Sequence, residues 1–231
     1  MYRIKVIFIG HANEAFIEQQ RLYRAPLCSS DTVIDFTSIK KGPETIEQTL
    51  DEILASQGIM DEVQAAAREK VDAIIVDCAL DPLLSALREC VRIPVVGAAQ
   101  SSYLMASALA DNFSIISPLA SLMPAYRRMA REYAVAEKLC SIRCLNIPIE
   151  DLLDEQAIKA FIEAGRTAIE RDGAQVLVLG CTGMSPVVPQ LSAALNVPIV
   201  DPAATAIAMA ESMVRLHLTH SAAAYPFKPL S

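Results

Sequence analysis

The chain has 231 residues, of which 53% are hydrophobic and 20% are charged, and its formal net charge is −7. The high apolar content excludes wholesale disorder, and the acidic balance leaves no basic stripe for a nucleic-acid partner. No apolar run reaches the roughly 18 residues of a membrane helix, and the apolar start is too short for a signal peptide. We therefore expect a cytoplasmic enzyme or binding protein with a small-molecule partner.

Short apolar runs alternate along the chain with helical stretches. Nearly continuous apolar runs are typical of parallel strands covered by helices on both faces, so the pattern predicts an α/β fold. The predicted strands are Arg3–Ile9, Thr32–Ile39, Ala73–Asp77, Ile93–Gly97, Phe113–Ser117, Ser141–Asn146, Val176–Leu179 and Val197–Val200. The predicted helices are Glu14–Tyr23, Thr45–Leu54, Asp61–Lys70, Pro82–Cys90, an alanine-rich stretch from Ala98, Leu122–Glu137, Glu155–Asp172, Pro186–Leu195 and Ala203–Leu218.

Three helix boundaries rest on particular residues. Gly58 predicts a break between the second and third helices. Two later helices begin with a proline behind a capping residue, which is Asp81 in one case and Ser185 in the other.

The two halves of the chain resemble each other. Val71–Cys78 parallels Ala174–Cys181, and Arg92–Gly97 parallels Asn196–Asp201 at nearly the same offset. This repeat favours two pseudo-symmetric lobes, each a small parallel sheet flanked by helices. The alternative is one doubly wound sheet with a repetitive α/β pattern.

Two of the six cysteines occupy matching places in this repeat. Cys78 and Cys181 each follow a buried strand and precede a predicted helix start, where ligands bind in open parallel sheets. Backbone N–H groups there would favour a thiolate. A single cysteine at a strand end is more often a buried filler, but two in equivalent positions indicate function. The four that we expect to be structural are Cys28, Cys90, Cys140 and Cys144.

A metal site has little support. No Cys-x-x-Cys pair occurs, and the three histidines lie far from the cysteines in sequence. Two thiols that face one carbon have a simpler use, because one can remove a proton while the other delivers a proton to the opposite face. That reaction inverts a stereocentre and requires no metal or organic cofactor.

The sequence around the cysteines resembles the aspartate/glutamate/hydantoin racemase superfamily, and within it the hydantoin/allantoin racemase branch. The motif Gly180-Cys181-Thr182-Gly183-Met184 after an apolar strand is the most specific part of the likeness, which covers most of the chain. Further matching segments are Gly42-Pro43, Thr45-Ile46-Glu47, Asp81-Pro82, Ile93–Gly97 and Val197–Asp201. Amino-acid racemases of the superfamily usually carry Glu where Gly183 stands, which disfavours an aspartate or glutamate substrate.

The resemblance implies a cofactor-independent racemase, commonly homo-oligomeric, with Cys78 and Cys181 on opposite walls of a cleft between two lobes. Residues 1–97 and 205–231 would form the first lobe, and residues 98–204 would form the second. The substrate would be a hydantoin-like cyclic ureide or a related amino-acid derivative.

Several residues beside the two cysteines are candidates for substrate binding. The family asparagine after the first strand is missing, and His11 or Asn13 is the candidate replacement. The other candidates are Ala79, Leu80, Ser117, Thr182 and Gly183. For some of these a structural role is equally open, since Ser117 precedes a proline in a turn and Thr182 sits at a helix start. Asp77 should point away from Cys78 by strand alternation, which indicates a structural role.

Two other classes of function stay open. A decarboxylase or a cis–trans isomerase of small dicarboxylates needs only one of the thiols, and an aspartate/glutamate-type racemase would share the two-thiol chemistry. A ligand-binding protein of the periplasmic type also has two α/β lobes, but no export signal supports it. The presence of both Cys78 and Cys181 favours the two-base racemase.

Overall fold

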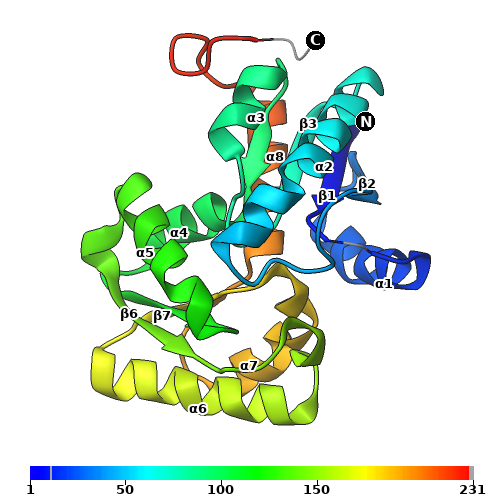
Figure 1. Cartoon of the computed structure of the whole chain (residues 1–231). Helices are drawn as coiled ribbons and strands as arrows, with labels where there is room; N and C mark the ends of the chain where they lie inside the picture. Colours follow the sequence, from blue (N-terminus) through cyan, green and yellow to red (C-terminus); the bar gives the residue numbers. More distant parts are fainter. Residues whose placement is uncertain (11, 229–231) are drawn as a thin grey trace. The chain divides into compact units, whose positions relative to one another are not determined.

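Two four-stranded parallel sheets organise the chain, and each belongs to its own unit (Figure 1). The computed structural model describes residues 1–10 and 12–228. The first unit takes Met1–Ala98 together with the C-terminal part from Ala206 onward, and the second takes Ala99–Thr205.

The first sheet has the strand order β2-β1-β3-β4, with every neighbouring pair parallel. Its strands are β1 (Tyr2–Phe8), β2 (Thr32–Ser38), β3 (Ala73–Asp77) and β4 (Val95–Gly97). All five residues of β3 are buried, as expected for a central strand covered on both faces. Phe8 pairs with Ser38 on one side and with Asp77 on the other, so the carboxyl ends of β1, β2 and β3 lie side by side.

The second sheet repeats this arrangement with the order β6-β5-β7-β8. Its strands are β5 (Phe113–Ser117), β6 (Leu139–Cys144), β7 (Val176–Leu179) and β8 (Ile199–Val200), again all parallel. The predicted α/β class, with small parallel sheets flanked by helices, is therefore confirmed. The predicted likeness between the halves extends to the strand order, because β5 to β8 take the places of β1 to β4.

A helix follows each strand along the chain. The helices are α1 (Glu14–Arg24), α2 (Thr49–Arg68), α3 (Leu84–Cys90), α4 (Ala98–Leu109), α5 (Met123–Glu132), α6 (Glu155–Asp172), α7 (Val188–Ala194) and α8 (Pro202–Arg215). α4 lies between β4 of the first sheet and β5 of the second in the chain, and α8 comes after the last strand. Short 3-10 helices stand at η1 (Ala25–Leu27), η2 (Ala120–Leu122), η3 (Ala136–Lys138), η4 (Ile149–Asp151) and η5 (Thr182–Val187).

The predicted break at Gly58 is wrong, because α2 runs unbroken through this position. Gly58 is buried, and a Cβ atom placed on it would lie 2.0 Å from the carbonyl oxygen of Lys41 and 3.2 Å from Cβ of Ile39. The glycine therefore serves close packing of the helix against the segment after β2. Gly58 does not end the helix.

The two predicted capping residues that precede a proline, Asp81 and Ser185, are also wrong. Asp81 and Leu83 take the left-handed conformation, with φ of 47° and 59°, and α3 begins only at Leu84. In the second half, the 3-10 helix η5 already starts at Thr182, so its N-cap residue is Cys181 and Ser185 lies inside it. Compared with the prediction, the helix begins farther from Cys78 in the first unit and closer to Cys181 in the second.

Each unit has its own apolar core around its sheet. In the first, Ile4, Val6 and Ile75 from the strands pack with Ile207 and Val214 of α8. In the second, Leu177 and Leu179 of β7 pack with Phe161 of α6 and with Leu191 and Leu195 around α7. Burial of side chains of this kind contributes about 1.5–3 kcal/mol each.

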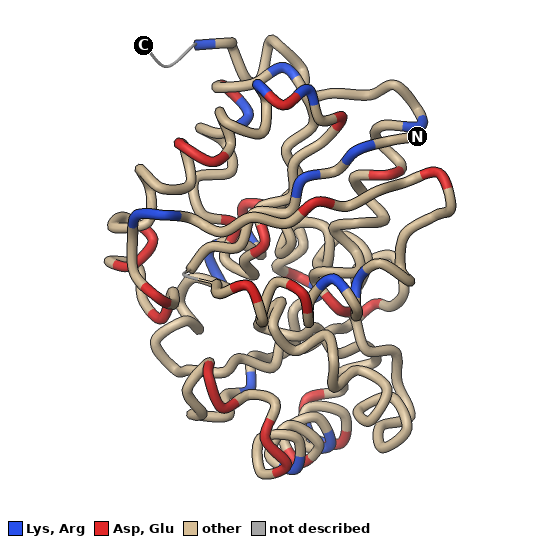
Figure 2. Tube along the Cα trace, turned by 90° about the vertical axis from the view of Figure 1, so that its right-hand side faces the viewer, with Lys and Arg blue, Asp and Glu red and all other residues tan. Residues whose placement is uncertain are grey.

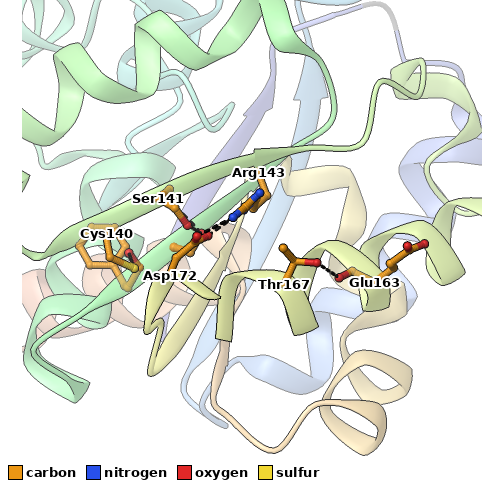
Figure 3. A network of polar contacts seen from close by, with 8 residues as sticks. Cys140, Ser141, Arg143, Glu163, Thr167 and Asp172 are labelled. Atoms are coloured by element: carbon orange, nitrogen blue, oxygen red, sulfur yellow. Dashed lines mark hydrogen bonds and ion pairs between the residues drawn. The ribbon is translucent and has the colours of Figure 1, made fainter. Parts of the chain in front are cut away.

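A polar network fastens the edge strand β6 to the C-terminal end of α6 (Figure 3). Arg143 donates two hydrogen bonds to Asp172, at 2.7 and 2.5 Å, and Ser141 also bonds this carboxylate. The guanidinium holds the pKa of Asp172 below its ordinary value. Because the two planar groups meet through paired bonds, the pair fixes the orientation of the edge strand on the helix.

Basic and acidic positions are interspersed along the described chain (Figure 2). None of the helices within the described residues is long and apolar enough to cross a membrane.

Candidate active site

The two candidate cysteines stand beyond the carboxyl ends of equivalent strands. Cys78 follows β3 directly, and Cys181 follows β7 after a single glycine. β3 and β7 occupy the same place in the two strand orders, beside β1 and β5 respectively. Both thiols are partly exposed. Each therefore lies at the carboxyl end of its sheet, which is where open parallel sheets bind their ligands.

Cys181 is held in an extended conformation at the start of η5. Its Sγ accepts a hydrogen bond from the N–H of Gly183 at 3.4 Å, and its carbonyl oxygen accepts one from the N–H of Met184 at 3.3 Å. A donor that points at the sulfur favours the thiolate over the thiol. The predicted position at the start of a helix is therefore confirmed for Cys181.

Cys78 lies in a tight turn, and no helix starts directly behind it. Its amide donates to the carbonyl of Val76 at 3.0 Å, and its carbonyl accepts from the amide of Asp81 at 3.1 Å. Asp81 is 6% exposed and packs on β4, since a Cβ atom on Gly97 would lie 2.5 Å from its carboxyl carbon. Asp81 contacts the end of β4 and takes the left-handed conformation, so the chain is not yet helical there. α3 begins at Leu84, and the predicted start at Pro82 is wrong.

The predicted substrate-binding residues of the first unit fall into two groups. Ala79 and Leu80 are buried, at 6% exposure each, in the turn that follows Cys78. Asn13 is exposed, and its side-chain oxygen caps α1 by accepting from the N–H of Phe16 at 2.8 Å. His11 lies outside the described residues.

In the second unit, the structure brings Thr182, Gly183 and Ser117 near the turn at Cys181. Thr182 is buried and Gly183 is partly exposed. Ser117 is fully buried, and its hydroxyl donates to the carbonyl of Leu119 at 2.7 Å. A Cβ atom on Gly180 would lie 3.0 Å from Cα of Ser117, so the end of β5 adjoins the residue before Cys181.

Three of the remaining cysteines have thiols that resist ionisation. Burial, with the nearby charge of Glu211, raises the pKa of Cys28 to about 11. Burial is also the main cause of the raised pKa of Cys90 and of Cys140. These surroundings fit the structural roles that the sequence predicted.

Cys144 differs from these three in position. It ends β6, where it pairs with Ser117 in the strand register, and so lies at the same sheet edge as Cys181. Its Sγ lies 3.0 Å from Oδ1 of Asn146, to which it donates. The sequence repeat offered no counterpart for Cys144, and so its place at this edge was missed.

Two further residues beside the cysteines were missed by the sequence analysis. Arg24 of α1 forms a buried ion pair with Asp77, which precedes Cys78. Tyr126 of α5 donates its hydroxyl proton to the carbonyl of Gly180, which precedes Cys181. An arginine in a surface-type helix is expected to face solvent, so its burial leaves no pattern in a single sequence, and a tyrosine in a helix normally indicates core packing.

Among the described residues, no group of three or more His, Cys, Asp or Glu side chains is arranged to hold a metal ion.

Comparisons with known proteins define the class of protein to which this fold belongs. The family model described as Asp/Glu/Hydantoin racemase matches residues 8–210. The protein is therefore an isomerase of the racemase type. It belongs to the Asp/Glu/hydantoin racemase family, as its cysteine motifs predicted.

Individual relatives point to one branch of this family. The hydantoin racemase of Paenarthrobacter aurescens is 35% identical over 191 residues, which cover 81% of each chain. The hydantoin racemase of Pseudomonas sp. (strain NS671) is 34% identical over 189 residues, or 81% of this chain and 76% of the relative. Among solved structures, an allantoin racemase from Klebsiella pneumoniae superposes with a TM-score of 0.94 at 29% identity, covering 100% of this chain and 95% of the other. The chain is thus similar to hydantoin and allantoin racemases.

Proposed function

We propose that this protein racemises a hydantoin-like cyclic ureide by a two-base mechanism in which Cys78 and Cys181 are the bases. One observation carries the proposal. A partly exposed thiol stands at the same strand end in each of two sheets that share one strand order. A single structural cysteine has no reason to recur at the equivalent point of a second sheet.

The proposed reaction uses the acidity of a ring C–H bond beside a carbonyl. One cysteine, as thiolate, removes this proton, and the bond's electron pair becomes an enolate delocalised over the carbonyl. The other cysteine, as thiol, gives its own proton to the opposite face of the same carbon. The substrate leaves inverted and the two sulfurs have exchanged protonation states, so the reverse direction starts from the form that the forward direction leaves. The mechanism requires no metal or organic cofactor.

The residues at Cys181 support a ring substrate rather than a free amino acid. The N–H of Gly183 donates to the sulfur at 3.4 Å, and a Cβ atom on this glycine would lie 3.5 Å from the same sulfur. Any side chain at this position would therefore begin in contact with the reactive atom. The glycine supplies the N–H donor and adds no acid beside it. A neutral ureide ring needs no charged partner at this point.

The test is a racemisation assay with purified protein. Single enantiomers of a 5-substituted hydantoin and of allantoin are incubated with the wild-type protein, and the enantiomer ratio is followed by chiral chromatography. We expect both enantiomers to approach an equal mixture, and aspartate and glutamate to stay unchanged. Retention of configuration in every ureide tested would contradict the proposal.

The same preparation separates the alternatives. A decarboxylase would release carbon dioxide from a substituted malonate and would tolerate loss of one of the two cysteines. Equilibration of D- and L-glutamate or of D- and L-aspartate would instead establish an amino-acid racemase. Serine variants at Cys78 and Cys181, tested separately, serve as the matched pair for all these assays.

A further inference from the structure

Helix α1 fully buries two of its side chains, and both are polar. They are Gln20 and Arg24, at 0% and 1% exposure, whereas Leu22 and Tyr23 of the same helix are exposed. A helix of a globular protein normally turns its apolar face to the core. Burial of a guanidinium costs free energy unless it is paired. α1 also makes apolar contacts, through Ile17 with the core and through Phe16 with Phe8. Its two fully buried side chains therefore add something beyond hydrophobic packing.

The partner of Arg24 is the residue directly before Cys78. Its Nη1 lies 2.8 Å from Oδ1 of Asp77, and the two side chains are 1% and 2% exposed. The guanidinium also lies over the ring of Phe8, 5.2 Å from its centroid, and Phe8 pairs with Asp77 in the strand register. Arg24 therefore ties the end of β3 to α1 and to the end of β1.

The second unit anchors the residue before Cys181 in the same way but with neutral groups. Tyr126 of α5 is fully buried, and its hydroxyl donates to the carbonyl of Gly180 at 2.8 Å. The N–H of Gly180 donates to the carbonyl of Ile116 at 2.9 Å, and a Cβ atom here would lie 2.6 Å from that oxygen. Both polar groups of the Gly180 peptide backbone are thus held.

The two anchors are structurally equivalent. α1 follows the first strand of the first sheet, and α5 follows the first strand of the second. We propose that Arg24 and Tyr126 are paired positioning residues, which hold Cys78 and Cys181 through Asp77 and Gly180. They differ in chemistry, so that a charged pair adjoins one thiol and a neutral hydrogen bond adjoins the other. This inference rests on the proposed function only in taking the two cysteines as the reactive groups.

The charged anchor makes a specific electrostatic prediction. Arginine stays protonated at every accessible pH, so neutralising Asp77 leaves the positive charge of Arg24 uncompensated beside the residue that precedes Cys78. Among the described residues, other charged groups at this end of the sheet are Asp81 in the following turn and Glu62 of α2, which bonds Thr37 of β2 and pairs with Lys40 at 3.2 Å. None of these is altered in the test.

The test measures the alkylation rate of each cysteine against pH by peptide mass spectrometry after iodoacetamide, without substrate. In Asp77→Asn we expect the midpoint for Cys78 to fall by about one pH unit, as for a unit charge nearby in a protein. The midpoint for Cys181 should stay in place. In the double variant Arg24→Met/Asp77→Asn, which removes both charges, the midpoint for Cys78 should return to the wild-type value.

The double variant also tests positioning by itself, since replacing a buried ion pair by uncharged groups is compatible with folding. At pH values where the thiol is fully ionised, its Cys78 should react at least about threefold faster because the strand end is no longer held. Tyr126→Phe, which removes one hydroxyl, should have the same effect on Cys181 and none on Cys78.

For Arg24, the inference is overturned if the Cys78 midpoint in Asp77→Asn equals that of the wild type, or if the fully ionised Cys78 of the double variant reacts no faster than in the wild type. For Tyr126, it is overturned if Cys181 of Tyr126→Phe reacts as in the wild type. A change of equal size at both cysteines in any variant indicates general loosening and also overturns it. Alkylation needs no turnover, so this result is independent of the racemisation assay. A protein that shows these shifts but inverts no ureide would retain the anchors and lose the proposed function.

Discussion

His220 covers the free edge of the first sheet by contacting Val95 of β4. Its Nε2 lies 2.8 Å from the amide nitrogen of Val95 and accepts its hydrogen bond. The ring of Tyr225 packs edge-on against the imidazole at 5.6 Å, and Arg88 lies over that tyrosine ring. An edge strand exposes unpaired backbone groups, and here a side chain that follows α8 in the sequence satisfies one of them.

This contact predicts a loss of stability in mild acid. Burial, helped by the positive charge of Arg88, lowers the pKa of His220 to about 4. In the unfolded chain the imidazole has its ordinary pKa of about 6.5, so the unfolded state binds the proton first. The contribution of His220 is complete above about pH 6.5 and is lost as the pH falls toward about 4. Urea unfolding across this range measures it.

The matched control for this prediction is His220→Gln, which keeps a hydrogen-bond acceptor but does not titrate. Carboxylates also titrate in this range, so the quantity to compare is the difference between the two proteins. We expect the free energy of unfolding of the variant to change less than that of the wild type between about pH 7 and about pH 4.5. Parallel curves for the two proteins would contradict this account of His220.

Replacing Gly58 by alanine should destabilise the protein, although the same substitution stabilises most helices. Glycine-to-alanine substitution inside a helix normally stabilises it by about 1 kcal/mol. At Gly58 the new Cβ atom would lie 2.0 Å from the carbonyl oxygen of Lys41, which is backbone and cannot rotate away. We expect Gly58→Ala to lower the free energy of unfolding by about 2 kcal/mol, as for other overpacked sites. The exposed neighbour Gln57, replaced by Ala, should change stability by less than about 0.5 kcal/mol in the same urea titration.

Sequence alone located the strands better than the helix ends. Ala73–Asp77, Phe113–Ser117 and Val176–Leu179 are confirmed to the residue, because continuous apolar runs between polar turns leave one register for a buried strand. The predicted helix starts at Pro82 and Pro186, behind the caps Asp81 and Ser185, were wrong because long-range packing against β4 and the early start of η5 decide them. Local capping signals do not contain that information.

The candidate site shows the same division between what a sequence contains and what only the fold decides. Cys78 and Cys181 could be proposed from the sequence because a repeat is visible in one chain and equivalent positions follow from it. The anchors Arg24 and Tyr126 were not found, because each reaches a backbone segment more than 50 positions away. Only the fold brings α1 to the end of β3 and α5 to the end of β7.

Cys78 and Cys181 should separate clearly in their reactivity from Cys28, Cys90 and Cys140. The thiolate is the form that reacts with iodoacetamide, and burial raises the pKa of Cys28 to about 11, so at neutral pH only about one Cys28 in ten thousand is ionised. Cys90 and Cys140 also have raised pKa values. We expect brief iodoacetamide treatment to label Cys78 or Cys181 first, and dilute peroxide to inactivate the protein through the same residues. Mass mapping that finds Cys90 or Cys140 labelled ahead of both would contradict the assignment.

Replacing either candidate base should separate proton exchange from inversion. In Cys78→Ser and, separately, Cys181→Ser, the remaining hydroxyl is a far weaker acid than a thiol and is almost never ionised at neutral pH. Racemisation of a 5-substituted hydantoin should fall by at least about a hundredfold in each variant, the lower range for loss of a general acid or base. Chiral chromatography measures the rate, and circular dichroism controls for folding.

The decisive measurement is made in D₂O with each enantiomer alone. Each variant keeps one thiol and should exchange the ring hydrogen of the enantiomer whose C–H bond faces that thiol. The two variants should therefore prefer opposite enantiomers, which proton NMR detects as loss of the ring C–H signal without inversion. A decarboxylase-type site would depend on one cysteine only. Full racemisation in either variant, or the same preferred enantiomer in both, would exclude two bases on opposite faces, whereas opposite preferences leave no one-base mechanism that fits.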